Sequence, residues 1–177
     1  RTLLLGFALL LVGYEAACRS GSWRLAALAV GLTFAMSLNN LIVRPQNWSW
    51  VPFAVFLAVL RATATGRWHW TWLLLCPIAT AIWANLHGAF VLGPILVGLS
   101  LVGETLGRLL KRSDAVSWTH LGRLVAVTGL TCLAPAANPQ GFGIFRYVAN
   151  LMLDPPSQGL IVEWQSPTPN GIANTAF

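Results

Sequence analysis

Charged side chains are scarce in this sequence, since Asp, Glu, Lys and Arg together make up only 9% of its 177 residues. A soluble globular domain carries about a quarter charged residues, so this chain has too few of them to cover a surface that faces water. Hydrophobic residues make up 56% of the chain, and its mean hydropathy is +0.66. The scarcity of charge excludes a soluble domain and predicts an integral membrane protein.

Cysteine is also rare, and the common catalytic motifs are absent. Cys18, Cys76 and Cys132 show no CxxC spacing and have no histidine close enough to suggest zinc binding, so we expect core thiols and no metal site. The composition excludes a disulfide scaffold, and the dominance of aliphatic residues excludes intrinsic disorder. The sequence holds no P-loop, HExxH, GxSxG or dinucleotide-binding motif.

Acidic residues number only 5 against 11 Lys and Arg, which gives a net charge of +6. In a soluble chain this excess would suggest a nucleic-acid partner. Here the cations sit in short gaps between apolar runs and form no continuous basic stripe. We therefore predict no nucleic-acid partner, and we expect these cations to set the orientation of membrane helices.

The sequence does contain a series of apolar runs that reach, or nearly reach, the roughly 17 to 25 residues of a membrane-spanning helix. They predict an all-α, polytopic integral membrane protein with about six transmembrane helices. Glu15 interrupts the first run near its end. The sixth run can cross the membrane only if Arg123 snorkels to the interface. The third and fourth are short unless interfacial tryptophans extend them. The expected spans are residues 2–18, 25–43, 48–60, 71–84, 89–106 and 121–137.

The character of the chain changes after the sixth run. Residues 142–152 mix aromatic and aliphatic side chains with one Arg and one Asn, which predicts a helix lying in the membrane interface. From residue 154 onward, repeated prolines predict an extended extracytoplasmic segment. We thus expect residues 1–153 to form a transmembrane helical bundle and residues 154–177 to form an extended segment that leads to a missing C-terminal part.

Neither end of the chain carries a closing element, since it starts at Arg1 inside an apolar run and stops at Phe177. We expect it to be a piece of a longer protein.

Lys and Arg alternate between the gaps. The gaps at residues 19–24, 61–70 and 108–120 hold seven of them, whereas the other face holds Arg44 and, after the sixth run, Arg146. Cytoplasmic loops of membrane proteins carry the excess of cations, so we expect the gaps at residues 19–24, 61–70 and 108–120 to be cytoplasmic.

With this topology, four polar clusters are expected to lie on the same extracytoplasmic side: residues 44–46, 83–88, 138–141 and 163–167. Polar residues near membrane depth are costly and tend to face a cavity or a ligand path, so this convergence predicts a shared site.

Arg44, His87 and Asn85 are the chemically informative residues of the first two clusters. An Arg fork suits a lipid-linked phosphate, although Arg44 taken alone better fits an arginine that snorkels to outer headgroups. His87 could donate to a phosphate or transfer a proton. The alternative is that Asn85 and His87 cap helix ends and satisfy each other's hydrogen bonds.

Glu163 beside Trp164 could bind a sugar, because a carboxylate accepts from hydroxyl groups while an indole stacks on a sugar face. An exposed loop acid is the alternative. Asn138 and Pro139 predict a turn that only ends a helix. His69 and His120 lie next to cytoplasmic cations and are expected to be ordinary interface residues.

Four short motifs follow one another along most of the chain: Arg44-Pro45-Gln46, Trp83 to Gly93, Asn138-Pro139-Gln140-Gly141, and Glu163-Trp164 with Ser166-Pro167. Their order and spacing resemble bacterial multi-pass membrane proteins of the GT-C glycosyltransferase type, related in pattern to mannosyltransferase-like proteins and lipid A sugar transferases. The resemblance implies a bacterial inner-membrane enzyme that passes a sugar from a polyprenyl-phosphate donor to an acceptor outside the cytoplasm.

The resemblance also implies roles for residues. Arg44, Gln46 and His87 would hold the donor phosphate, Asn85 would position one of them, and Glu163 with Trp164 would border the acceptor. The catalytic base would be an acidic residue of an earlier extracytoplasmic loop, upstream of Arg1, and a divalent metal stays open as a cofactor. The competing classes are a transporter or flippase for a lipid or anionic solute, and a non-catalytic membrane subunit.

Overall fold

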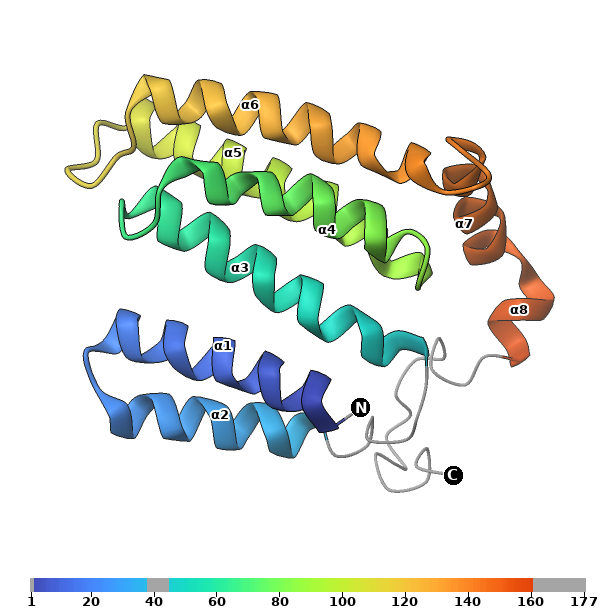
Figure 1. The fold of residues 1–177 in the computed structure, drawn as a ribbon, viewed down its shortest axis with the longest axis horizontal. Coiled ribbons are helices and arrows are strands. Elements are labelled where there is room, and N and C mark those ends of the chain that lie inside the picture. The colour runs from blue at the N-terminus through green and yellow to red at the C-terminus, as the bar shows by residue number, and fades with distance from the viewer. Residues whose placement is uncertain (1, 38–44, 161–177) are drawn as a thin grey trace.

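The computed structural model describes residues 2–37 and 45–160, and every regular element within these ranges is helical. Figure 1 shows helices running back and forth side by side, with a further helix crossing one end of the bundle. The elements in chain order are α1 (Thr2–Ser20), α2 (Trp23–Ser37), η2 (Pro45–Ser49), α3 (Trp50–Ala64), η3 (Trp70–Leu74), α4 (Leu75–Trp83), η4 (Gly88–Val91), α5 (Leu92–Leu109), α6 (Trp118–Leu133), η5 (Ala134–Ala137), α7 (Gly143–Leu153) and α8 (Pro155–Leu160).

Consecutive helices pair as the three hairpins α1–α2, α3–α4 and α5–α6, whose turns lie at the same end of the bundle (Figure 1). Gly21 and Gly66 adopt φ of 64° and 70° in the first two turns, a backbone conformation that glycine adopts without strain. These three turns are the cation-rich gaps at residues 19–24, 61–70 and 108–120. The predicted alternation of cation-rich and cation-poor gaps therefore corresponds to two opposite ends of one bundle.

The packed core lies among α3, α4, α5 and α6. Phe56, Leu73, Trp83 and Phe90 are fully buried there. Gly93 lets α5 lie close to α4, because a Cβ atom at this position would be 2.7 Å from Thr80 Oγ1 of α4. The α1–α2 hairpin packs against α3 and contributes few buried side chains to this core.

Three helical stretches are long and apolar enough to cross a membrane: Thr2–Ser20, Gly88–Leu109 and Trp118–Ala137. Shorter apolar helices occupy Trp23–Ser37 and Trp70–Trp83. Large apolar side chains cover the outward helix faces, for example Leu3 at 87% exposure and Leu99 at 64%. An apolar exterior of this extent suits lipid and not water, so the helices indicate a membrane-embedded protein.

Two expectations about the fold require correction. Only Cys76 is a core thiol, because Cys18 and Cys132 lie on exposed positions of α1 and α6. The segment after residue 153 begins with a helix, α8, and is not extended there. Proline suits the first helical turn, where its missing N–H group is not needed, and the Asp154 carboxylate accepts hydrogen bonds from Ser157 N and Oγ at 3.0 and 2.6 Å.

The predicted interfacial segment forms helix α7, which lies across the end of the bundle (Figure 1). Its apolar side faces the bundle, where Ile144 and Val148 are buried and Phe145 meets Phe90 edge to face at a ring-centroid distance of 5.4 Å. The second expected span is described only as far as Ser37.

Candidate functional site

Three polar segments meet at the end of the bundle opposite the hairpin turns (Figure 1). They are η2, the turn at residues 84–87 between α4 and η4, and the turn at residues 138–142 between η5 and α7. Side-chain hydrogen bonds join η2 to the first turn and the first turn to the second. Residues 45–46, 83–88 and 138–141 thus gather at one end, as the sequence predicted, whereas Arg44 and residues 163–167 lie outside the described residues.

A hydrogen-bond chain runs from Trp83 through Ser49 to His87. Trp83 Nε1 donates to Ser49 Oγ at 2.9 Å, and Ser49 Oγ lies 3.0 Å from His87 Nδ1. An indole N–H can only donate, so the Ser49 oxygen accepts from Trp83. Backbone Ala89 N donates to His87 Nδ1 at 3.2 Å, which makes His87 the cap of η4 and makes Nδ1 an acceptor. The Ser49 hydroxyl accordingly donates to His87 Nδ1.

These contacts select one tautomer of His87. Because Nδ1 accepts hydrogen bonds, the neutral imidazole carries its proton on Nε2 and presents an N–H donor there. Burial lowers the pKa of His87, which favours this neutral form near pH 7. Trp83 is fully buried and anchors the chain in the core. The site therefore offers a positioned hydrogen-bond donor that carries no net charge.

Asn85 and Asn138 hold the two turns together. Asn138 Nδ2 donates to Ala84 O at 3.1 Å and to Asn85 Oδ1 at 3.2 Å, and Asn138 Oδ1 accepts from Gln140 N at 2.9 Å. Asn85 Nδ2 donates to Ala81 O at 2.8 Å. Both amides are therefore engaged in fixing backbone, and they position the segment that carries His87.

His87 lies on the wall between two cavities. The first, which we name the His87 groove, has a volume of about 430 Å³ and lies between α1, α2, α3 and the η4–α5 segment. The second measures about 480 Å³ and lies between the α4–η4 turn, α5 and α7. The His87 groove is lined by Leu5, Ala8, Leu9, Val12, Thr33, Ser37, Ser49, Trp50, Phe53, Ala54, Leu57, Trp83, His87, Ala89 and Leu92. Its walls are apolar except near Ser49 and His87 and at two hydroxyl groups of α2.

The predicted site residues have different outcomes. His87 and Asn85 lie in one turn. His87 caps η4, which agrees with the alternative that these two residues cap helix ends. The expected mutual hydrogen bond is wrong, since His87 contacts Ser49 and Ala89 while Asn85 contacts Ala81 and Asn138. Gln46 belongs to η2, but its side chain is not described. Glu163 and Trp164 lie outside the described residues, so their predicted contact with an acceptor stays a prediction.

Sequence reasoning missed Ser49 entirely and gave Trp83 no role. Ser49 lies 38 residues from His87 and 34 from Trp83, so no local pattern could have paired them. His120 is also not an ordinary interface residue. It is buried in α6, and its Nε2 atom has no hydrogen-bond partner among the described residues. His69 is exposed, as expected, with Nδ1 lying 3.0 Å from Thr71 Oγ1.

Within residues 2–37 and 45–160, no group of three or more His, Cys, Asp or Glu side chains is arranged to hold a metal ion. The neutral His87 site itself brings together hydroxyl, indole and imidazole groups without a carboxylate. Because the Trp83 and Ser49 protons are used within the hydrogen-bond chain, the donor left for a ligand is His87 Nε2–H, which suits an oxyanion better than a divalent cation.

No protein-family model, no curated protein and no solved structure matches this chain. The features of this end of the bundle that bear on function are a neutral donor at His87, a buried anchor at Trp83 and an apolar groove lined by both.

Proposed function

We propose that this protein is a membrane glycosyltransferase of the GT-C type that transfers a sugar from a polyprenyl-phosphate donor to an acceptor on the extracytoplasmic face. The observation that carries the proposal is the position of His87, a fixed N–H donor at the polar end of an apolar groove of about 430 Å³. A polyprenyl phosphate has the matching shape, with a long apolar tail and an anionic head.

In the proposed topology, six helices α1 to α6 cross a bacterial plasma membrane and α7 lies in its outer interface. The hairpin turns with their seven Lys and Arg residues face the cytoplasm. The short helices α2, α3 and η3–α4 cross with the help of flanking segments and interfacial tryptophans such as Trp48 and Trp72. His87 then lies near the extracytoplasmic headgroups, where a lipid-linked phosphate is found.

The proposed reaction is a displacement at the anomeric carbon of the donor sugar. The acceptor hydroxyl oxygen forms a bond to this carbon, its proton passes to a carboxylate general base, and the bond to the donor phosphate oxygen breaks with its electron pair on that oxygen. Negative charge on the departing phosphate thereby increases. A hydrogen bond from His87 Nε2 strengthens as this charge develops and so stabilises the leaving group.

Other residues have supporting roles in this proposal. Arg44 and Gln46 adjoin or belong to η2, the segment that Ser49 links to His87, and they would add charge and a hydrogen bond to the phosphate. Asn85 acts as a positioning residue, through its bond with Asn138. Glu163 and Trp164 would border the acceptor sugar.

The test uses the purified full-length protein and a polyprenyl-phosphate sugar, with binding and sugar transfer measured separately. His87→Ala should weaken binding and transfer by about tenfold or more, the value of one hydrogen bond to a charged group. His69→Ala is the matched control, because His69 is an exposed histidine in a hairpin turn at the other end. Equal binding by His87→Ala and the unchanged protein would remove His87 from the site.

The two competing classes give different results in the same experiment. A flippase would bind the donor lipid and move it across vesicle membranes without releasing the sugar. A non-catalytic subunit would show neither transfer nor transport. Either result, obtained with the folded full-length protein, would overturn the transferase proposal.

A further inference from the structure

The cation-rich end of the bundle contains a charge cluster centred on Glu15. Glu15 Oε1 accepts from Arg19 Nε at 3.0 Å, and Glu15 Oε2 accepts from Arg67 Nη2 at 2.8 Å. Arg61 Nε lies 4.0 Å from Glu15 Oε1, beyond hydrogen-bond distance. The Glu15 side chain is only 12% exposed, whereas that of Arg61 is 44% exposed. One carboxylate therefore faces three guanidinium groups, and Arg61 keeps donors for another anion.

A second groove begins beside this cluster, between α1, α3 and α5. We name it the leucine groove, because its inner walls are formed by Leu57 and Leu60 of α3 and by Leu96 and Leu99 of α5. Its volume is about 330 Å³. These leucines lie toward the middle of the bundle, since each helix continues past them to its end at the hairpin turns.

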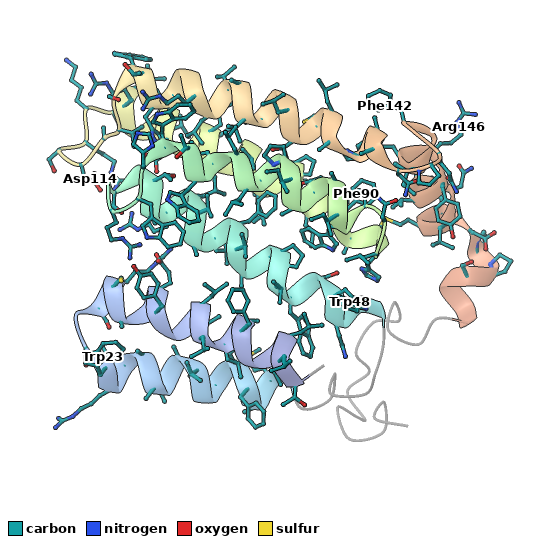
Figure 2. All side chains as sticks on the ribbon, in the orientation of Figure 1. Trp23, Trp48, Phe90, Asp114, Phe142 and Arg146 are labelled. Atoms are coloured by element: carbon teal, nitrogen blue, oxygen red, sulfur yellow. The ribbon has the colours of Figure 1, made fainter. Side chains whose placement is uncertain are left out.

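The mouth of the leucine groove carries both signs of charge. Arg19 and Arg61 line it on one side, and Ser100 and Glu104 of α5 line it on the other. Arg61, Ser100 and Glu104 also line a polar cavity of about 530 Å³ that continues toward the α5–α6 turn. Figure 2 shows Asp114, which lines that outer cavity, at the same end as Trp23 and far from Arg146.

Glu104 is the unusual member of this mouth. It lies in a helix long and apolar enough to span a membrane, more than one turn before its end, and it forms no ion pair with another residue of the described ranges. Its electrostatic neighbour on α6 is His120. An ionisable residue at this depth is costly, and such residues usually face a polar ligand or a cavity.

We propose that the leucine groove binds a phospholipid with a phosphoethanolamine headgroup, at the membrane face opposite the His87 site. An acyl chain would lie along the four leucines, the phosphate would accept hydrogen bonds from Arg19 and Arg61, and the ammonium group would pair with Glu104. An apolar wall with cations on one side of its mouth and a carboxylate on the other offers a partner to each part of this lipid: the acyl chain, the phosphate and the ammonium group. A headgroup with phosphate alone would leave the Glu104 carboxylate beside an anion and without a partner.

The test measures lipid preference of the purified, delipidated full-length protein in detergent. Dioleoyl phosphatidylethanolamine and dioleoyl phosphatidylglycerol are added in equal amounts, and the bound lipid is counted by native mass spectrometry. We expect the ethanolamine lipid to be favoured by about tenfold, the effect of one charge-assisted pair. Equal retention of the two lipids would overturn the proposal.

Variants separate the two ends of the headgroup. Glu104→Gln should reduce the preference to about twofold or less, because the neutral amide no longer pairs with the ammonium group. Arg61→Gln should weaken binding of both lipids. Asp114→Asn and Arg24→Gln are the matched controls, since Asp114 lines only the outer cavity and Arg24 lines neither. An unchanged preference in Glu104→Gln, or an equal loss in the controls, would contradict the assignment.

A measurement on the unchanged protein keeps the proposal testable if Glu104→Gln does not fold. Phosphatidylcholine carries the same charges as phosphatidylethanolamine but has no ammonium N–H donors. We expect it to bind several-fold more weakly than the ethanolamine lipid, because it cannot donate to Glu104. Equal binding of the two would overturn the role of Glu104. Water-soluble glycerophosphoethanolamine should bind far more weakly than either lipid, because it cannot occupy the leucine groove.

Discussion

Ser49 Oγ lies 3.0 Å from His87 Nδ1, although the two residues are 38 positions apart in the chain. The same oxygen accepts from the fully buried Trp83 Nε1, and the donor Ala89 N at His87 Nδ1 makes that nitrogen an acceptor for the Ser49 proton. This relationship ties η2 to the α4–η4 turn. It also leaves His87 Nε2 as the atom that carries the proton and can meet a ligand.

Removing the Ser49 hydroxyl should therefore affect both stability and the state of His87. In Ser49→Ala the buried Trp83 N–H loses its acceptor, which we expect to cost about 1–2 kcal/mol of unfolding free energy. Thermal unfolding in detergent would measure the loss of stability. ¹⁵N NMR of the imidazole would measure the decrease in the population of the Nε2–H tautomer. Ser49→Thr keeps a hydroxyl group and is the control. A tautomer ratio unchanged in Ser49→Ala would contradict the role given to Ser49.

Stability should also depend on pH through His87. Burial lowers the pKa of His87 below its ordinary value of 6.5, so the unfolded chain takes up a proton before the folded chain as the pH falls. Stability contributed by the neutral form is thus complete above about pH 6.5 and is lost below it. A protonated Nδ1 also cannot accept from Ser49 or from Ala89 N.

We accordingly expect the melting temperature to decrease as the pH is lowered from about 7 to about 5. The variant His87→Gln should be less stable at neutral pH and should show a smaller decrease, because the Gln side chain at position 87 does not titrate. The measurement is a series of melting curves at constant ionic strength. A fall of equal size in both proteins would assign the dependence to other groups.

Asn138 should be the more important half of the link between the two turns. Asn138→Ala removes the donor to Ala84 O and Asn85 Oδ1 and the acceptor for Gln140 N, and we expect a loss of about 1–2 kcal/mol. Gln140→Ala is the matched control, since the described contact of Gln140 is made by its backbone N–H group. Chemical unfolding would compare the two, and equal stabilities would show that the link contributes little.

Close packing at Gly93 gives a prediction for the core. In Gly93→Ala the new methyl group would lie 2.7 Å from Thr80 Oγ1 and 3.1 Å from Phe56 Cζ, so we expect a loss of about 1–3 kcal/mol from overpacking. Gly98→Ala, in the same helix, meets no atom within 4 Å and should be neutral or stabilising. Melting temperatures of the pair test this contrast. Equal values would mean that α5 can shift away from α3 and α4.

Much of the helical architecture could be predicted from local sequence. The runs that predicted spans at residues 2–18, 89–106 and 121–137 correspond to the three helices that are long and apolar enough to cross a membrane. The length and hydropathy of one apolar run are local properties, so the sequence alone is enough to recognise them. Helix ends were less predictable, as α8 shows, because capping by Asp154 and Ser157 depends on side-chain geometry.

Burial of single residues was predicted poorly. Cys18, Cys76 and Cys132 all lie in apolar runs, yet only Cys76 is buried. His120 sits among cations in the sequence and is nevertheless buried in the structure. When nearly every residue of a helix is apolar, the sequence does not distinguish the face toward protein from the face toward lipid. That distinction comes from the neighbouring helices.

The sequence alone determined the all-helical class, the apolar exterior and the separation of cations toward one set of turns, because each depends on composition and on short-range order. It also directed attention to Asn85 and His87. Only the tertiary structure decided which residues meet: Ser49 with Trp83 and His87, Asn85 with Asn138, and Glu15 with Arg67. The physical reason is that hydrogen bonds and ion pairs act over about 3 Å, whereas their partners lie tens of residues apart and are brought together only when helices pack.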